Sequence, residues 1–226
     1  MKAMILAAGR GERMRPLTDT TPKPLLKVND KALIEYHIEK LKKVGVTDFV
    51  INHAWLGNVI EEYLGDGTRY GVRISYSPEQ PGGLETAGGI RHALHLLGDE
   101  PFVVVNGDVY CELDYGELVN TELGDALGCL YLTDNPDFHP EGDFSIRDGY
   151  LDLKPELTFS GMAVYRPEAF KNIPDERAKL KPYFDKWIAG RQLRARYLSA
   201  YWCDVGTPER LRDLDTRLRN RHMAEA

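Results

Sequence analysis

A short loop near the start of the chain combines glycines with arginines directly after an apolar run. Gly9, Gly11 and Arg13 follow residues 3–8. Glycine lets the backbone approach an anion closely and turn its N–H groups toward it, and a guanidinium group suits phosphate oxygens. The loop lacks the third glycine of a dinucleotide fingerprint and the Gly-Lys-Ser/Thr end of a P-loop. It therefore predicts a phosphate-binding loop of another kind, with a tight turn bearing solvated arginines as the alternative.

A lysine between two prolines follows in Pro22-Lys23-Pro24. Each proline fixes its own φ and restrains the residue before it, so this pattern predicts a stiff, extended segment that holds the Lys23 amine in place. A rigidly placed cation suits phosphoryl transfer, in which catalysis is mainly positioning and charge stabilisation. An edge strand without a chemical role is the alternative.

Together these two segments resemble the signature of the sugar-phosphate nucleotidyltransferases. The match reads Leu-Ala-Ala-Gly-x-Gly-x-Arg-x-x-Pro-x-Thr over residues 6–18 and continues as Pro-Lys-Pro-Leu over residues 22–25. The resemblance implies a Rossmann-like α/β fold in which the glycine loop wraps the phosphates of a nucleoside triphosphate. It also implies that Arg13 and Lys23 stabilise charge at the pyrophosphate and the α-phosphate. The loop residues are Leu6, Ala8, Gly9 and Gly11.

Two aspartates at the ends of strand-like runs are candidate metal ligands. Asp108 follows residues 103–107, and Asp204 closes residues 201–204. A nucleotidyl transfer needs a hard divalent cation, which prefers carboxylate oxygens, whereas a lone aspartate at a strand end is more often a cap or turn residue. The family carries its metal ligands in a Gly-Asp and in a Trp-x-Asp-x-Gly-Thr motif, and both occur here in that order. The resemblance therefore implies that Asp108 and Asp204 bind Mg²⁺.

Further loops are expected to complete the substrate sites. Residues 52–57 and 76–79 follow predicted strands on the same rim as the glycine loop, and the glycine-rich segment 82–89 opens a helix whose N–H groups favour an oxygen-rich ligand. From the resemblance, the nucleotide-binding residues are Asn52, Ala54, Glu79, Gly83 and Asn106. The sugar-binding residues are Glu85, Thr86, Gly142, Asp143, Lys154 and Ser160, with Lys154 on the sugar phosphate. Glu85 could instead serve only as a first-turn carboxylate that favours the helix dipole.

The elements that must position these residues alternate between strand-like and helix-like patterns, which indicates a mainly parallel sheet flanked by helices. Strands are predicted at 3–7, 48–52, 72–76 and 102–106, and helices at 33–43, 55–64 and 86–97, the last with Thr86 as N-cap. Short strands at 126–132, 143–146 and 157–165 predict a second, mixed sheet layer packed on the first half. A helix at 179–189, a strand at 193–198 and a helix from Pro208 close the chain.

Length and charge restrict the kind of protein further. The 226 residues are expected to form one domain, with a nucleotide-binding half at about 1–124 and a sugar-binding, metal-completing half at about 125–226. A net charge of −6 disfavours nucleic acid and anionic membranes as partners, although residues 10–27 hold five basic side chains against two acidic ones. The start of the chain resembles a strand and not a signal peptide, and the three cysteines form no CxxC pair. We expect a cytoplasmic monomer or small homo-oligomer.

Among the short members of the family, the chain is most similar to the uridylyltransferases that act on N-acetylmuramate 1-phosphate in peptidoglycan recycling. Residues 11–18, 51–57, 76–79, 84–86 and 158–161 carry this similarity. It implies an Mg²⁺-dependent, in-line reaction of UTP with the sugar 1-phosphate. Ala87 stands where a glycine is expected in that group, so a mannose-1-phosphate guanylyltransferase or another sugar-1-phosphate nucleotidyltransferase is the alternative. An inactive nucleotide-sugar-sensing subunit is a second alternative, which the presence of Arg13, Lys23 and both aspartates disfavours.

Overall fold

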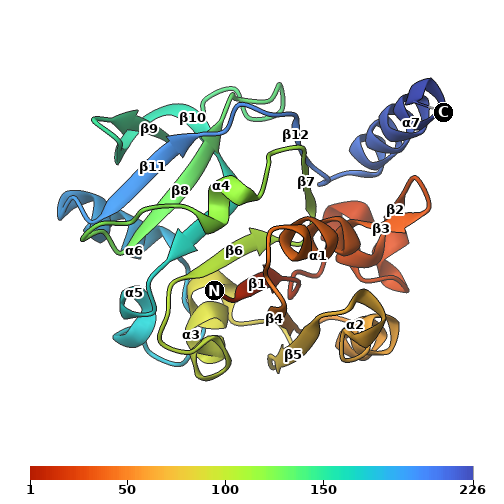
Figure 1. Cartoon of the computed structure of the whole chain (residues 1–226), viewed down its shortest axis with the longest axis horizontal. Helices are drawn as coiled ribbons and strands as arrows, with labels where there is room; N and C mark the ends of the chain where they lie inside the picture. The colour runs from red at the N-terminus through yellow and green to blue at the C-terminus, as the bar shows by residue number, and fades with distance from the viewer. Residues whose placement is uncertain (226) are drawn as a thin grey trace.

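The computed structural model describes residues 1–225 and is built on one eight-stranded sheet (Figure 1). The strand order is β11-β8-β10-β6-β1-β4-β5, and β9 pairs with β10. The strands are β1 (Ala3–Leu6), β4 (Asp48–His53), β5 (Arg73–Pro78), β6 (Phe102–Asn106), β8 (Gly128–Thr133), β9 (Phe144–Arg147), β10 (Tyr150–Tyr165) and β11 (Leu193–Tyr197).

The four consecutive strands β6, β1, β4 and β5 are parallel, and their register sets the rim of the site. Strand β1 pairs in parallel with β4 and β6, so that Leu6 lies beside both Asn52 and Asn106. These strands are nearly continuous apolar runs because both faces of the sheet are covered. Ligands of such sheets bind outside the carboxyl ends of the strands, and here those ends are level.

Helices cover the two faces of the sheet and form two cores with it. Ile5 and Ile51 pack on one face with Ile34 and Ile38 of α1 (Leu33–Lys43). Met4 and Val50 pack on the other face with Ile90 of α3 (Glu85–Leu97). This alternation follows from the two-residue period of a strand. The helices are α1 (Leu33–Lys43), α2 (Gly57–Leu64), α3 (Glu85–Leu97), α4 (Gly116–Val119), α5 (Glu168–Lys171), α6 (Lys181–Ala189) and α7 (Pro208–Glu225).

The prediction of a second sheet layer after residue 125 is wrong. Strand β10 pairs antiparallel to β6, with Met162 beside Val105, and its other edge pairs with β8. The later strands therefore extend the first sheet, because β6 presents a free edge that the apolar end of β10 covers. The register of β10 against β8 shifts between Phe159 and Met162, which places a bulge next to the rim of the site.

Helix α7 joins the chain's end to the glycine loop through a third core. Leu214 and Leu218 of α7 pack with Met14 and Val28. The hairpin of β2 (Lys27–Val28) and β3 (Lys31–Ala32) is also tied to α7. Its turn is held by the Asp215 carboxylate, which accepts from the Asn29 N–H at 2.7 Å. The segment that carries Arg13 is thus fixed from behind by α7.

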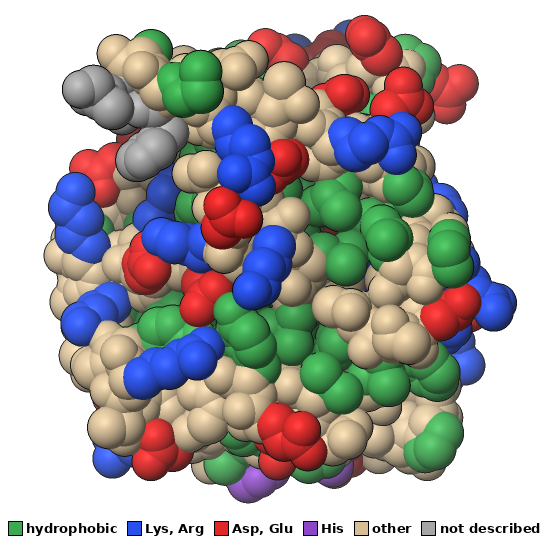
Figure 2. Space-filling view, turned by 90° about the vertical axis from the view of Figure 1, so that its right-hand side faces the viewer, with side chains coloured by type: hydrophobic (Ala, Val, Ile, Leu, Met, Phe, Trp, Pro, Cys, Tyr) green, Lys and Arg blue, Asp and Glu red, His purple; other side chains and the backbone are tan. Residues whose placement is uncertain are grey.

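Figure 2 shows the side of the molecule that lies on the right in Figure 1, where α7 and the β2–β3 hairpin are found. Basic and acidic side chains are intermixed there beside exposed apolar ones, so neither sign of charge forms a continuous field on this face. Within residues 1–225, no helix combines the length and the apolar character that crossing a membrane requires.

His37 is a fully buried histidine on α1 that ties the helix to β7 (Val109–Cys111). Its Nε2 lies 2.8 Å from the Val109 carbonyl oxygen and its Nδ1 lies 2.7 Å from the Tyr115 hydroxyl. Because a carbonyl only accepts, Nε2–H is the donor and Nδ1 accepts from Tyr115. Burial lowers the pKa of His37 to about 4, so the ring is neutral in the folded protein.

We expect His37 to make the free energy of unfolding fall as the pH decreases from about 6.5 to about 4. In this window the unfolded chain protonates the imidazole and the folded protein does not, so the unfolded state binds more protons. The loss should reach up to about 3 kcal/mol at the lower end. Urea unfolding of the wild type and of His37→Gln, which keeps a donor and an acceptor without titrating, measures this difference. Equal pH slopes for the two proteins would contradict the assignment.

Candidate active site

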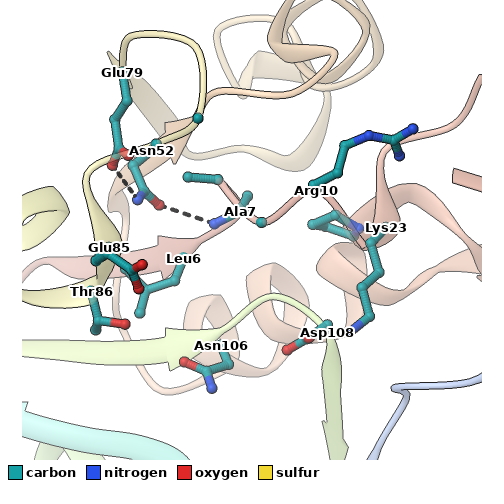
Figure 3. A pocket seen from close by; sticks show the side chains of 15 residues that line it. Leu6, Ala7, Arg10, Lys23, Asn52, Glu79, Glu85, Thr86, Asn106 and Asp108 are labelled. Carbon is teal, nitrogen blue, oxygen red and sulfur yellow. Dashed lines mark hydrogen bonds and ion pairs between the residues drawn. The ribbon is translucent and has the colours of Figure 1, made fainter. Parts of the chain in front are cut away.

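Two adjoining cavities open along the carboxyl ends of β1, β4 and β6. The first, of about 390 Å³, is lined by these strand ends, the glycine loop and the start of α3 (Figure 3). The second, of about 360 Å³, is lined by the loop after β8, the bulge of β10 and the end of β12 (Trp202–Asp204). Asn106 and Asp108 line both cavities. A ligand in the first cavity would therefore meet a ligand in the second at these two residues.

A chain of hydrogen bonds that starts from Asn52 fixes the wall of the first cavity. The buried Asn52 accepts from the Ala7 N–H at 3.0 Å and donates to Glu79 Oε1 at 2.7 Å (Figure 3). Glu79 Oε2 in turn accepts from the Leu84 N–H at 2.7 Å. A Cβ built on Gly89 would lie 3.0 Å from Asn52 Nδ2, so glycine is needed where α3 passes this network. The network sets the spacing between the glycine loop and α3.

The basic side chains of the glycine loop have two different environments. Arg10 lies 3.8 Å from the centre of the Trp55 ring, and both Arg10 and Arg15 pair with Asp19 at 2.9 Å. These contacts, led by the hydrogen bond from Arg10, lower the pKa of Asp19. Arg13 has no ion pair within residues 1–225, and its side chain lines the second cavity. Arg13 is thus available to an anion, whereas Arg10 and Arg15 hold the loop together.

The prediction that Lys23 lies in an extended segment is wrong. Lys23 begins a 3₁₀ turn over Lys23–Leu25, in which the Leu25 N–H donates to the Pro22 carbonyl at 2.9 Å. Prolines are compatible with the start of a helical turn, because the N–H groups there need no partner within the turn. The turn directs the Lys23 amine at Asp108, with Nζ 2.5 Å from Oδ2.

Asp108 and Asp204 meet through the pairing of β7 with β12. Asp204 lies beside Val109 in this antiparallel pair, and the Val205 N–H donates to the Asp108 carbonyl at 3.0 Å. Both carboxylates line the second cavity and are about one quarter exposed, at 30% for Asp108 and 26% for Asp204. Within residues 1–225, no group of three or more His, Cys, Asp or Glu side chains is arranged to hold a metal. Two carboxylates fit Mg²⁺, which usually takes one or two from the protein and the rest from substrate phosphates and water.

The second cavity has polar groups on its far wall. Asp143 accepts from the Phe159 N–H at 2.8 Å, and its other oxygen lies 2.9 Å from His139 Nε2. The Trp202 indole N–H donates to the Ser160 carbonyl at 2.8 Å. Gly161, at a φ of +77°, leaves no room for a side chain, because a Cβ there would overlap the amide of Asn106. The bulge thus brings β10 against the end of β6, where the two cavities meet.

Most of the predicted site residues line one of the two cavities. The first is lined by Leu6, Ala8, Gly9, Lys23, Asn52, Glu79, Gly83, Glu85, Thr86, Asn106 and Asp108, and the second by Arg13, Asn106, Asp108, Asp143, Ser160 and Asp204. Glu85 and Thr86, which were expected at the sugar, face the first cavity across from Lys23 (Figure 3). Thr86 is not the N-cap of α3, because the helix begins at Glu85 and Glu79 takes the Leu84 N–H.

Four predicted residues line neither cavity. Gly11, at a φ of +70°, and Gly142, at a φ of +74°, shape their loops, and Ala54 lies behind Gly83. Lys154 has a side chain that is 62% exposed, and its amine pairs with Glu156 at 2.5 Å. Residues of the second cavity or its border that the sequence analysis missed include Phe138, His139 and Arg210. The position of Arg210, six residues after the predicted metal ligand Asp204, was a sequence signal that it lies near the site. No sequence signal pointed to Phe138 or His139.

Comparison with known proteins agrees with this arrangement. A family model described as nucleotidyl transferase matches residues 2–133, more than half of the chain. The chain is 52% identical to an N-acetylmuramate alpha-1-phosphate uridylyltransferase of Neisseria meningitidis serogroup B, over 94% of this chain and 96% of that protein. It is 34% identical to a protein of the same name from Caulobacter vibrioides, over 96% of both chains.

A crystal structure from Bacillus anthracis, described as a putative glucose-1-phosphate thymidylyltransferase in complex with sucrose, has a similar fold. It superposes with a TM-score of 0.84 at 24% identity and covers 97% of this chain and 95% of that one. At this identity the match concerns the fold alone.

Proposed function

This chain belongs to the nucleotidyl transferase family, and we propose that it condenses UTP with N-acetylmuramate 1-phosphate to UDP-N-acetylmuramate and pyrophosphate. The observation that carries the proposal is the pair of adjoining cavities that share Asn106 and Asp108. Two substrates bound in them would meet beside a pair of carboxylates and a lysine. The identity of 52% with a uridylyltransferase over nearly the full length of both chains supports the choice of substrates.

UTP is proposed to bind in the first cavity. The glycine loop would receive the phosphates on its backbone N–H groups, as such loops do for anions. The wall built by Asn52, Glu79 and Gly83 would receive the base, and Glu85 and Thr86 at the start of α3 would lie nearest to the ribose or the sugar. The sugar of the second substrate would lie in the second cavity against Asp143 and Ser160.

The proposed reaction is an in-line displacement at the α-phosphorus of UTP. A phosphate oxygen of the sugar 1-phosphate forms the new P–O bond, and the bond to the β-phosphate breaks to release pyrophosphate. No general base is needed, because a phosphate monoester is already an anion at neutral pH. Lys23 would stabilise the charge at the α-phosphate, and Arg13 would stabilise the leaving pyrophosphate. Mg²⁺ held by Asp108 and Asp204 would supply a positive charge that offsets those of the phosphates.

We further propose that this reaction serves the recycling of peptidoglycan sugars in the cytoplasm, where UTP is made. The chain would act there as a monomer or small homo-oligomer.

Pyrophosphate release from a matrix of substrates tests the proposal. Each of UTP, GTP, dTTP and CTP is combined with N-acetylmuramate, mannose, glucose or N-acetylglucosamine 1-phosphate in the presence of Mg²⁺. UTP with N-acetylmuramate 1-phosphate should give a kcat/KM at least about 10-fold above every other pair, a difference typical of a few specific polar contacts. A higher kcat/KM for GTP with mannose 1-phosphate would identify a guanylyltransferase instead. Binding of nucleotide sugars without turnover of any pair would identify a sensing subunit.

A further inference from the structure

Arg210 lies at the border of the second cavity without a role in the function proposed above. It is in the first turn of α7, and its side chain is 15% exposed. The guanidinium carbon lies 3.8 Å from the centre of the Phe138 ring, and Nη1 lies 3.4 Å from Asp204 Oδ2. Phe138 and Asp204 both line the cavity. The guanidinium is therefore held between an aromatic face and a predicted metal ligand, both of which line the second cavity.

A second guanidinium group is close to that of Arg210. A Cβ built on Gly206 would lie 3.1 Å from an Nη atom of Arg13 and closer still to one of Arg210. The two side chains come from the glycine loop and from α7, and both lie against the same glycine. Asp204 is the carboxylate that pairs with Arg210, and within residues 1–225 none pairs with Arg13. Two like charges this close repel unless anions lie beside them, so their convergence suits the place where two phosphate groups meet, with the leaving pyrophosphate at Arg13 and a second phosphate at Arg210.

The second cavity offers few other cations for the phosphate of a sugar. Its lining includes the carboxylates of Asp108, Asp143 and Asp204. Among residues 1–225, the basic side chains that line it are Arg13 and His139, and His139 faces Asp143. Lys154, expected at this phosphate, is exposed and pairs with Glu156 outside both cavities. A dianionic phosphate among three carboxylates needs a positive partner, and Arg210 is placed to provide it.

We propose that Arg210 binds the phosphate of the acceptor sugar and orients it for attack; this rests on the proposed function. Stacking on Phe138 keeps the guanidinium plane fixed, so that little side-chain freedom is lost on binding. A carboxylate that ligates a metal attracts a neighbouring guanidinium less strongly. The ion pair between Asp204 and Arg210 would therefore weaken when Mg²⁺ and the substrates bind. The phosphate is favoured over any other group of the sugar because Arg210 is next to Asp204, at the reacting end of the cavity.

Steady-state kinetics of Arg210→Met, with Arg210→Lys and Arg212→Met beside it, tests this inference. Arg212 is exposed on the same helix and lines neither cavity, so it is a matched control. We expect Arg210→Met to raise the KM for the sugar 1-phosphate by about 10- to 100-fold, as for the loss of a charged hydrogen bond. The KM for UTP should change less than about threefold. Arg210→Lys should recover part of the loss, and Arg212→Met should leave all constants unchanged.

Two further measurements separate this role from other roles of Arg210. If Arg210 only positioned Asp204, the half-saturating Mg²⁺ concentration would rise in Arg210→Met and the KM for the sugar 1-phosphate would not, which would overturn the proposal. N-acetylmuramate 1-phosphate carries a lactyl carboxylate that N-acetylglucosamine 1-phosphate lacks. If Arg210 bound this carboxylate and not the phosphate, kcat/KM in Arg210→Met would fall for the first acceptor and not for the second, which would also overturn the proposal. Equal losses for both acceptors would support it.

The inference and the proposed function can fail separately. Wild-type protein that prefers another sugar 1-phosphate contradicts the proposed function, and the same KM comparison is then made with that acceptor. Wild-type protein that uses N-acetylmuramate 1-phosphate, with an unchanged KM in Arg210→Met, contradicts the inference alone.

Discussion

Replacing Asp108 or Asp204 by asparagine is expected to lower kcat by about 10³-fold or more while the protein stays folded. Each substitution keeps the shape of the side chain and removes one of the two carboxylate charges that β7 and β12 bring together. An amide oxygen is a weaker ligand for Mg²⁺ than a carboxylate, so the charge of the phosphates would be left largely uncompensated. Chelation of divalent cations in the wild type should have the same effect and be reversed by added Mg²⁺.

The loss should be visible in metal binding as well as in turnover. Mn²⁺ in place of Mg²⁺, followed by its electron paramagnetic resonance signal in the presence of UTP, should bind more weakly to both variants. Asp213→Asn is the control, because Asp213 is exposed on α7 and lines neither cavity. Thermal unfolding should be close to that of the wild type for all three variants. Near-normal turnover of both Asp108→Asn and Asp204→Asn would refute the metal assignment.

The part of the site that follows the central strands could be predicted because parallel strands end level. Leu6, Asn52 and Asn106 are each the last or nearly the last residue of an apolar run, and their register places them side by side. The same rule places the glycine loop and Glu79 on this rim. Here local pattern and tertiary position agree, since each strand is continuous in the sequence and its direction is fixed by the crossover helix.

Other features depend on contacts that no local pattern encodes. The strands after residue 125 were predicted as a separate layer because their spacing indicates hairpins but not which edge they cover, and β10 covers the edge of β6. The two prolines beside Lys23 favour an extended segment, but they are equally compatible with a turn. The local pattern therefore could not distinguish the two, and the structure has the turn. Arg210 is a candidate for substrate binding because of tertiary contacts. Helix α7 packs on Met14, and the loop that carries Phe138 lies against the Arg210 guanidinium.

Replacing Lys23 by methionine is expected to lower kcat by about 10²- to 10³-fold, with a smaller change in the KM for UTP. The Lys23 side chain is 11% exposed, and its amine lies 2.5 Å from Asp108 Oδ2. Lys23 lines the first cavity beside the place proposed for the α-phosphate. Negative charge on the oxygens around that phosphorus grows as the reaction proceeds. A fixed cation there therefore stabilises the transition state more than the bound substrate. Lys23→Arg should recover only part of the rate, since a planar guanidinium cannot occupy the same point.

The dependence of the Lys23→Met rate on Mg²⁺ concentration distinguishes two possible roles of Lys23. If the amine only held Asp108 in place for the metal, a high Mg²⁺ concentration would restore the rate of Lys23→Met, because saturation of the site would overcome weaker binding. If it stabilises the α-phosphate directly, the loss in kcat persists at saturating Mg²⁺, and we expect this result. Lys27→Met is the control, because Lys27 is exposed on β2 four residues further along and lines neither cavity. A full recovery by Mg²⁺ would make Lys23 a positioning residue for Asp108, and the charge at the α-phosphate would then depend on the metal and on the N–H groups of the glycine loop.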